Sequence, residues 1–321
     1  MILLPHEKPI AEMAETIHRF KEQNRKNPVW SKEEVTRMER KLGELKARIY
    51  EELQPWERVA ICRHPQRPHA LDYLNNLCEE YVEIFGDRTF QDDHAVITAF
   101  GKIGGRKILF VGQEKGKDTE SRLFRNFGMM HPEGYRKAMR AMRLAAKFNI
   151  PVVTLIDTPG AYPGLTAEER GQGWAIANNL WEMARLPTPI LSVVIGEGCS
   201  GGALGIGVSD TIGMLEHAYY SVISPEGCSS ILWKDGGKTE TAAAALKMQV
   251  ENLIPLGLVD AKIAEPPGGA HIDPAVVYRN VSLFIENELE RLQNLPVDLL
   301  LETRYQKFRK MGRFSFHETS I

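Results

Sequence analysis

Hydrophobic residues recur at every third or fourth position through the first part of the chain, in two separate stripes. The stripes consist of Ile10, Met13, Ile17 and Phe20, and of Val35, Met38, Leu42, Leu45, Ile49 and Leu53. This spacing places apolar side chains on one face of a helix. Ser31 and Glu34 form a capping-box pattern before the second helix, and Pro55 ends it. Because Asn24 to Pro28 interrupts the pattern, residues 1–55 are predicted to form a helical hairpin arm. The arm either packs on its own domain or contacts another subunit.

Farther along, short β-branched runs alternate with amphipathic stretches. The runs predicted as strands are 95–100, 107–112, 151–156, 190–195, 212–215, 219–223 and 258–264. The stretches predicted as helices are 71–85, 135–148, 167–185, 201–208, 226–233, 239–253 and 274–293. Gly104-Gly105 joins the first two strands as a hairpin, and the glycine-punctuated segment 116–134 is predicted to be a long loop. The alternation of strands and helices predicts an α/β fold with a largely parallel sheet. The tail after residue 295 is basic and polar.

Two strand–turn–helix units begin at Pro151 and Pro189, 38 residues apart. The second unit contains Ser192 to Gly207, where a β-branched run ends in glycines and small residues. Glycine lets another group approach the backbone closely, and a helix N-terminus presents unpaired N–H groups. Such a turn is suited to holding a phosphate or a developing oxyanion.

Composition and charge narrow the class of protein. The chain has 321 residues, 43% of them hydrophobic, and a net charge of −2, which gives no indication of nucleic acid or of an anionic membrane surface. The start lacks a basic region and a long apolar run, and no stretch reaches the roughly 18 apolar residues of a membrane span, so we expect a cytoplasmic location. Its four cysteines are expected to be reduced thiols. Cys62, His64, His69 and Cys78 match no close-paired zinc spacing, so no metal site is predicted in this chain.

Two motifs suggest other chemistry. Asp157 to Gly164 is similar to a GTPase switch, but no complete phosphate loop accompanies it: Gly236-Gly237-Lys238-Thr239 lacks the first glycine and follows a helix. We therefore favour a shaped substrate-binding turn at Asp157 to Gly164. Gly198 to Gly202 matches the letters of a nucleophile elbow, with Ser200 as the nucleophile.

A serine hydrolase also needs a base and a residue that orients it. His217 or His271, with Asp210 or Asp260, are available, but neither pairing is distinctive. Helix capping or a scaffolding role of Ser200 is favoured over nucleophilic attack.

Basic residues cluster before and along the helix predicted at 135–148. The loop carries Lys115, Lys117, Arg122 and Arg125, and the helix carries Arg136, Arg140, Arg143 and Lys147 on one face. A solvated face is the ordinary interpretation, and contact with an anionic ligand or partner is the alternative.

Several stretches, taken together, resemble one family. They are Pro65 to Pro68, Arg125 to Met129, Pro132 to Ala138, Asp157 to Gly164 with Ala167 to Gln172, Gly196 to Gly198 with Ser200 to Ala203, and Ser221 to Cys228. In this order they look like the α subunit of the carboxyltransferase of bacterial acetyl-CoA carboxylase. The family pattern has glycine where this chain has Cys199, and usually alanine at Gly205. Cys199 permits the same turn if its φ is negative.

The resemblance implies a crotonase/Clp-protease-like spiral of ββα units, preceded by the helical hairpin. It divides the chain into the arm (1–55), a carboxyltransferase domain (56–295) and a C-terminal tail (296–321). It implies transfer of a carboxyl group from carboxybiotin to acetyl-CoA, giving malonyl-CoA for fatty-acid synthesis. It also implies a zinc-ribbon β subunit in an α2β2 assembly, a biotin carboxyl carrier protein and a biotin carboxylase. Biotin is then attached to the carrier protein and not to this chain.

By the same resemblance, the backbone N–H groups of Gly201, Gly202 and Ala203 are the oxyanion hole for biotin. The remaining residues implied to bind substrate are Gly160, Ala161, Tyr162, Pro163, Gly164, Gly198, Ser200, Lys115 and Arg125. The base is then the ureido nitrogen of biotin, so no catalytic His or Asp is expected. The alternatives are an acyl-CoA hydratase, isomerase or hydrolase of the same fold, and a non-catalytic assembly partner.

Overall fold

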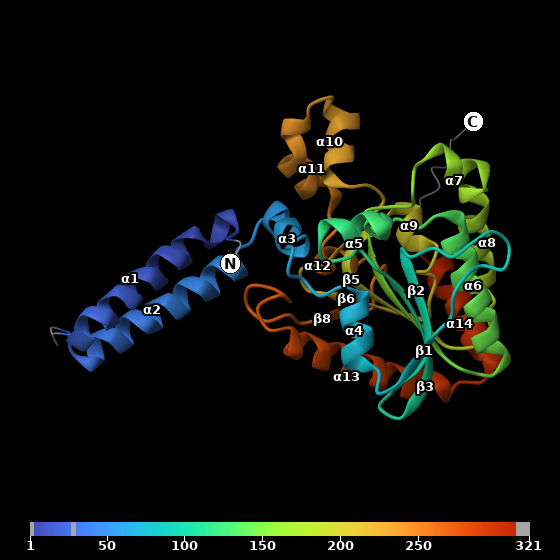
Figure 1. Ribbon diagram of the computed structural model, residues 1–321, viewed down its shortest axis with the longest axis horizontal. Coiled ribbons are helices and arrows are strands. Elements are labelled where there is room, and N and C mark those ends of the chain that lie inside the picture. Colours follow the sequence, from blue (N-terminus) through green and yellow to red (C-terminus); the bar gives the residue numbers. More distant parts are fainter. Residues whose placement is uncertain (1–2, 27–29, 313–321) are drawn as a thin grey trace, which may run out of the picture.

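The computed structural model describes residues 3–26 and 30–312. An arm begins with η1 (Pro5–Glu7) and continues as α1 (Lys8–Lys26) and α2 (Lys32–Glu51), which run side by side away from the body (Figure 1). Part of the predicted break, residues 27–29, lies outside the described residues. The helical hairpin predicted from the two apolar stripes is confirmed.

The predicted capping box starts α2. The Glu34 N–H donates to Ser31 Oγ at 3.2 Å, and the Ser31 N–H donates to Glu34 Oε2 at 2.9 Å. These two bonds satisfy backbone donors that a helix start leaves unpaired. At the base of the arm, Leu4 and Leu53 pack with the fully buried Ile61. The predicted division into arm, domain and tail stays a prediction.

The body is built on one sheet of eight strands within the described residues. They are β1 (Tyr81–Glu83), β2 (Val96–Ile103), β3 (Arg106–Gln113), β4 (Val152–Thr158), β5 (Ile190–Cys199), β6 (Thr211–Leu215), β7 (Tyr219–Ser221) and β8 (Ala261–Ile263). Their order is β1-β2-β3-β4-β5-β6-β8, with β7 paired beside the end of β5. β1 to β3 are antiparallel and the other strands are parallel. The hairpin of β2 and β3 and the largely parallel sheet were predicted, whereas β1 was not.

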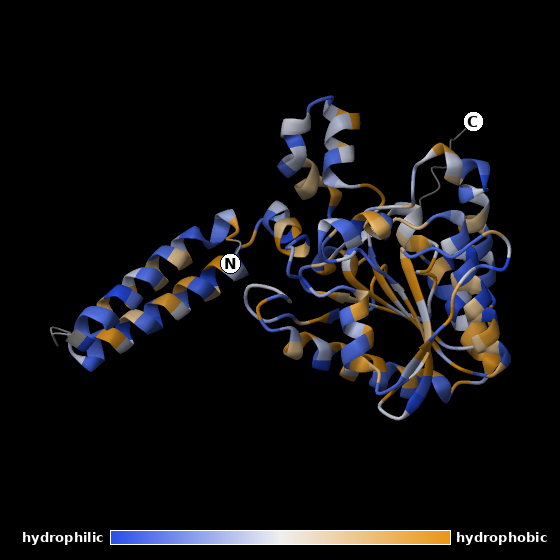
Figure 2. Ribbon diagram, viewed as in Figure 1, coloured by the Kyte–Doolittle hydropathy of each residue, from blue (hydrophilic) through white to orange (hydrophobic). Residues whose placement is uncertain are grey.

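Helices cover both faces of this sheet. The remaining elements are α3 (Pro55–Cys62), α4 (Ala70–Leu77), α5 (Thr119–Phe124), η2 (Asn126–Gly128), α6 (Pro132–Lys147), α7 (Leu165–Glu169), α8 (Gln172–Ala184), α9 (Ser200–Leu204), α10 (Pro225–Trp233), η3 (Gly236–Lys238), α11 (Thr239–Leu246), α12 (Val250–Leu253), α13 (Pro274–Gln293) and α14 (Val297–Arg309). α4 and α13 pack on one face, and α6, backed by α8, packs on the other. The strands between them are mostly hydrophobic (Figure 2), so the core lies on both sides of the sheet.

Several predicted elements differ in the structure. The helix predicted at 239–253 is broken at Lys247, which has a φ of 50°, into α11 and α12. The helix predicted at 71–85 ends at Leu77, because Cys78 is extended and the following residues pair with β2 as β1. The loop predicted at 116–134 contains α5, whose start is capped by Asp118, and η2. The helix predicted at 167–185 is broken at Gly171, which has a φ of 81°. In each case a local backbone choice or strand pairing overrides the periodic pattern.

The C-terminal segment, expected to be a polar tail, contains α14. Arg304 on this helix is 1% exposed and binds the carbonyl oxygens of Met183, Leu186 and Thr188 at 2.8–2.9 Å. Residues 313–321 of the predicted tail lie outside the described residues. In the part of the chain that the structure describes, no helix is both long and apolar enough to cross a membrane.

Candidate functional site

The two strand–turn–helix units lie side by side at the centre of the sheet. β4 pairs with β5 from Val152 opposite Ile190 to Ile156 opposite Val194, which reproduces the 38-residue spacing of the sequence. Near the strand ends the register shifts, and Thr158 faces Gly198. The two turns that follow lie at the carboxyl edge of these parallel strands, the usual place for a ligand.

The two predicted turns meet at Gly202. A Cβ built on Gly202 would lie 2.4 Å from the carbonyl carbon of Gly160 and 2.6 Å from the nitrogen of Ala161. Only glycine therefore allows α9 to lie against the Gly160–Ala161 peptide. The Tyr162 N–H donates to the carbonyl of Met130 at 3.1 Å, which ties the turn to the segment before α6.

The first residue of α9 has an unusual backbone. Ser200 has a φ of 55°, the left-handed region that a non-glycine residue adopts only where the surroundings require it. The N-cap is Cys199, and no side chain of the described residues caps the helix there, so capping of this helix by Ser200 is wrong, and a scaffolding role for Ser200 stays a prediction. Cys199 has a φ of −107°, which satisfies the condition under which cysteine permits the turn.

The hydrolase interpretation finds no support in the geometry. Among the described residues, no hydrogen bond joins Ser200 to a histidine; His271 stacks on His64 with ring centroids 3.6 Å apart, and His217 is buried. Burial raises the pKa of the Cys199 thiol to about 11, so it is protonated at neutral pH. The Gly236 to Thr239 segment follows α10 and forms η3 and the first residue of α11, so it is not the strand-to-helix phosphate loop that nucleotide hydrolysis needs.

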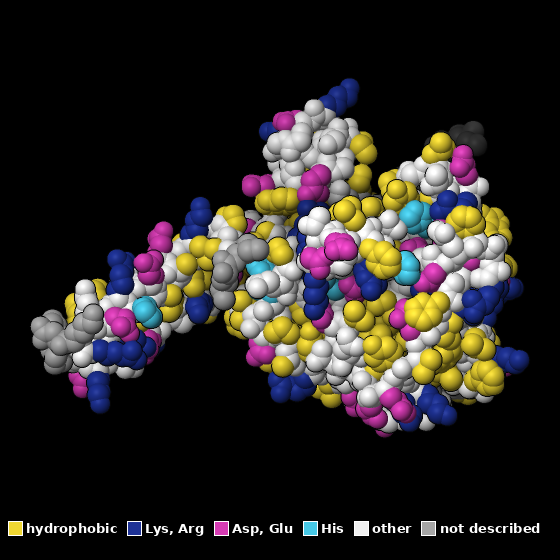
Figure 3. Space-filling view, viewed as in Figure 1, with side chains coloured by type: hydrophobic (Ala, Val, Ile, Leu, Met, Phe, Trp, Pro, Cys, Tyr) yellow, Lys and Arg dark blue, Asp and Glu magenta, His cyan; other side chains and the backbone are white. Residues whose placement is uncertain are grey.

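A mostly apolar cavity opens beside the glycine turn. Its volume is about 270 Å³, and it is lined by Ser200, Gly201, Leu204, Tyr220, Ser221, Val222, Leu253 and Leu258. Ser200 is exposed and Gly201 half-buried, whereas Gly202 and Ala203 are buried. The start of α9 thus presents backbone at the edge of an apolar cavity. Figure 3 shows that hydrophobic side chains also reach the surface of the body between charged ones.

A buried charge network lies at the ends of β4 and β5, and it was not predicted from the sequence. Lys115 Nζ lies 2.7 Å from Asp157 Oδ1 and 2.6 Å from Glu197 Oε1. Burial alone would raise the pKa of both carboxyls, but the Lys115 ammonium holds the pKa of each below its usual range. Lys115, predicted to bind substrate, is thus ion-paired with two carboxylates and joins the ends of β4 and β5.

His69 completes this network. Its Nδ1 lies 3.2 Å from Asp157 Oδ2, and its buried Nε2 has no hydrogen-bond partner among the described residues. His69, Lys115 and Asp157 help to line a second cavity of about 230 Å³, which reaches Pro159. From the sequence, His69 was a candidate only for zinc, because nothing along the chain links it to Asp157, 88 positions away. Across residues 3–26 and 30–312, no group of three or more metal-binding side chains is placed to hold a metal ion.

The other basic residues make contacts within the chain. Arg125 donates to the carbonyl of His94 at 3.0 Å, and it lines neither of these cavities. On α6, Arg136 binds Asp87 at 2.7 Å and Arg140 binds the carbonyl of Gly86 at 3.0 Å. The structure therefore pairs Lys115 with Asp157, at the start of the first turn, whereas Arg125 binds the carbonyl of His94.

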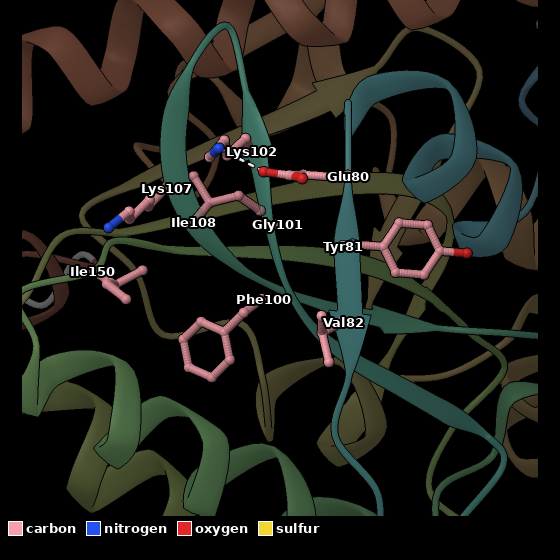
Figure 4. Close-up of a pocket in the computed structure, with 9 residues that line it drawn as sticks. All are labelled: Glu80, Tyr81, Val82, Phe100, Gly101, Lys102, Lys107, Ile108 and Ile150. Carbon is pink, nitrogen blue, oxygen red and sulfur yellow. Dashed lines mark hydrogen bonds and ion pairs between the residues drawn. The ribbon is translucent and has the colours of Figure 1, made fainter.

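A third cavity lies at the antiparallel edge of the sheet (Figure 4). Its volume is about 310 Å³, and apolar side chains of β1 to β3, including Val82 and Phe100, line it together with Ile150. Its charged members include Lys102 and Glu80, which pair with each other. It contains none of the residues predicted to act in the site.

Known proteins resemble this chain over its whole length. The family model described as "Acetyl co-enzyme A carboxylase carboxyltransferase-like" matches residues 3–312. The acetyl-coenzyme A carboxylase carboxyl transferase subunit alpha of Chlamydia caviae is 60% identical over 320 residues, covering 100% of this chain and 98% of the relative. The protein of the same name from Protochlamydia amoebophila is 57% identical over 314 residues, covering 98% and 99%.

Solved structures share the fold at low identity. A Pseudomonas malonate decarboxylase hetero-tetramer in complex with coenzyme A gives a TM-score of 0.58 at 16% identity, covering 74% of this chain and 92% of that one. Transcarboxylase 12S, solved with methylmalonyl-coenzyme A, gives 0.54 at 18% identity, covering 80% and 45%. The β subunit of P. aeruginosa geranyl-CoA carboxylase gives 0.54 at 16% identity, covering 83% and 48%. The crotonase-like α/β fold is confirmed.

Proposed function

This chain belongs to the acetyl-coenzyme A carboxylase carboxyltransferase alpha family, and we propose that it provides the biotin side of a site shared with a β subunit. As a member of that family, it is a biotin-dependent carboxyltransferase component. Its reaction transfers a carboxyl group from carboxybiotin to acetyl-CoA, giving malonyl-CoA for fatty-acid synthesis. It works in a multi-subunit complex.

The proposed oxyanion hole consists of the backbone N–H groups of Gly201, Gly202 and Ala203. Gly201 and Gly202 stand in the first turn of α9, where a helix leaves N–H groups without intrahelical partners, and Ala203 is the next residue. The single observation that carries the proposal is the contact of Gly202 with the Gly160–Ala161 peptide, which holds this turn rigidly beside the second one. Rigid donors stabilise developing charge without having to reorganise.

The residues around the apolar cavity fit biotin. Its volume of about 270 Å³ and mostly apolar lining suit a small ring system, and its edge at Ser200 and Gly201 offers backbone N–H groups. When carboxybiotin gives up its carboxyl group, negative charge is left on the ureido oxygen. The backbone of Gly201 to Ala203 then donates hydrogen bonds to that oxygen.

The neighbouring turn and strand shape the rest of the proposed site. Gly160 and Ala161 contact Gly202, and Tyr162, Pro163 and Gly164 are proposed to continue this wall of the site. A Cβ on Gly198 would come within 2.9 Å of the Tyr220 ring, so a side chain there would disturb the strand end that leads into the turn. Lys115 supports the site by pairing with Asp157 of β4 and with Glu197 of β5. Arg125 remains a proposed substrate contact.

The finer partners are also proposals, supported by the family. We propose a zinc-ribbon β subunit in an α2β2 assembly, a biotin carboxyl carrier protein that carries the biotin, and a biotin carboxylase. The β subunit would mainly hold CoA. Cytoplasmic location and the absence of a metal from this chain stay predictions.

The assay that tests the proposed function measures malonyl-CoA formed from carboxybiotin and acetyl-CoA by this chain, with and without a β subunit. We expect product only from the mixture. Hydrolysis of acyl esters by the isolated chain that is lost in Ser200→Ala would contradict the proposal in favour of a hydrolase.

A further inference from the structure

We propose that Gln113 is a positioning residue for carboxyl transfer, because its side chain fixes the direction of the Ala203 N–H in the proposed oxyanion hole. The inference rests on the proposed function of that hole. Gln113 is the last residue of β3, and it is fully buried.

Both ends of the Gln113 amide bind backbone. Its Nε2 donates to the carbonyl oxygen of Gly202 at 2.8 Å, and its Oε1 accepts the N–H of Asp157 at 3.1 Å. Because one partner is an acceptor and the other a donor, only this orientation of the amide satisfies both. The side chain therefore bridges the end of β4 and the first turn of α9.

The bond to Gly202 controls a donor on the far side of the same peptide. The Gly202 carbonyl and the Ala203 N–H belong to one planar trans peptide group, so they point in opposite directions. Holding the carbonyl toward β3 directs the N–H away from it. A hydrogen bond at the carbonyl also polarises the amide and strengthens its N–H as a donor.

The other end of the bridge is fixed to the strands. The Asp157 carboxylate accepts the Glu197 N–H at 3.0 Å and the Lys115 ammonium at 2.7 Å, so Asp157 is tied to β5 as well as to β4. Gly202 meanwhile packs on the Gly160–Ala161 peptide. The proposed oxyanion peptide is thus held by Gln113 through its carbonyl and by the neighbouring turn through its α carbon.

The kinetic test compares Gln113→Met with a matched control in the reconstituted carboxyltransferase. Asn179 is also buried, and its Nδ2 donates to the carbonyl of Gly205, just after α9, at 2.9 Å. The Gly205 carbonyl belongs to the same peptide group as the Ile206 N–H, and this N–H is outside the proposed hole. Since one oxyanion donor is worth on the order of 10²–10³ in rate, we expect Gln113→Met to lower kcat about ten- to a hundredfold, with KM for acetyl-CoA unchanged within about threefold. Asn179→Leu should keep kcat within about threefold.

An NMR test observes the Gly202–Ala203 peptide group directly. With carbonyl-¹³C glycine and ¹⁵N alanine incorporated into the full chain, only Gly-Ala pairs give a carbonyl–amide correlation, and the sequence contains three: Gly160–Ala161, Gly202–Ala203 and Gly269–Ala270. Gln113→Met should move the Gly202–Ala203 signal. The Gly269–Ala270 signal, whose N–H donates to Glu265 Oε2 at 2.7 Å, should stay in place and report an intact fold.

If Gln113→Met does not fold, Gln113→Leu replaces it, because leucine can neither donate to Gly202 nor accept from Asp157. An unmoved Gly202–Ala203 signal overturns the inference. The inference is also overturned if Gln113→Met leaves kcat unchanged while Gly202→Val abolishes transfer. A moved signal with full activity in both Gln113→Met and Gly202→Val would instead contradict the oxyanion role in the proposed function.

Discussion

Gly202 lies against Gly160 so closely that a Cβ on Gly202 would come within 2.4 Å of the Gly160 carbonyl carbon. The obstacle is backbone, which cannot rotate away as a side chain can. The neighbouring Gly201 differs, because a Cβ there would meet only the end of the Ile176 side chain, at 3.4 Å.

We therefore expect Gly202→Ala to lower the free energy of unfolding by about 1–3 kcal/mol, the usual effect of overpacking. Gly201→Ala, one residue away, should change it by no more than about 0.5 kcal/mol. Chemical denaturation of both variants measures the difference. Equal stability of the two variants would show that the turns are not in contact.

Ser200 provides a second prediction, because its φ of 55° disfavours β-branched side chains. Ser200→Val should lower the free energy of unfolding by about 1–3 kcal/mol, the range typical of backbone strain. The free energy of unfolding of Ser200→Gly should be no more than about 0.5 kcal/mol below that of the wild type, since glycine adopts this backbone freely. A Ser200→Val variant as stable as Ser200→Gly would contradict the backbone assignment.

Lys115→Met tests the buried charge network through pH. The pKa values of Asp157 and Glu197 lie below their usual range in the folded chain, so their contribution to stability is present above the unfolded pKa of about 4 and is lost as pH falls through the folded values. Without the ammonium, burial raises both folded pKa values, and the folded variant takes up protons at higher pH than the wild type.

The stability deficit of Lys115→Met should therefore be largest near neutral pH and shrink as the pH is lowered toward 4. Urea unfolding across this range measures it. Lys117→Met is the control, because Lys117 pairs with Asp72 at the surface and such pairs contribute about 0–1 kcal/mol. A deficit for Lys115→Met that is constant with pH would contradict the pairing.

Arg304 anchors α14 through buried bonds. Its guanidinium binds both oxygens of Asp210, at 2.7 and 2.8 Å, and both side chains are nearly inaccessible to solvent. Arg304→Met leaves Asp210 without this partner, so we expect a loss of about 3–5 kcal/mol in the free energy of unfolding. Arg309→Met, on the exposed side of the same helix, should stay within about 0.5 kcal/mol of the wild type. Similar values for the two would mean that α14 does not dock as described.

Local patterns predicted much of this fold. The capping box at Ser31, the hairpin at Gly104-Gly105 and the helix at 274–293 all depend on neighbours in the sequence, and the structure has each of them. The 38-residue spacing even anticipated the register of β4 and β5. β1 and the docking of α14 were missed, because they depend on pairing and burial against distant residues.

Some residues of the candidate site could likewise be predicted from local sequence, and others could not. The glycine-rich turns could be found from the sequence, because close backbone approach requires a recognisable residue type. Gln113, His69 and Asp157 could not be joined, since their contacts span 40 or more positions: 44 from Gln113 to Asp157 and 88 from His69 to Asp157. Their side chains carry no local pattern that distinguishes them from other buried polar residues.

The most direct test of the central claim is a single-turnover measurement of malonyl-CoA formed from carboxybiotin by this chain assembled with a β subunit, beside the same assembly built with Gly202→Val. We predict that assembly is retained, as measured by sedimentation, and that the transfer rate falls by about 10²–10³, the effect of losing an oxyanion-hole donor. A Gly202→Val assembly that transfers carboxyl groups at the wild-type rate would contradict the claim, because this chain would then be a structural partner only.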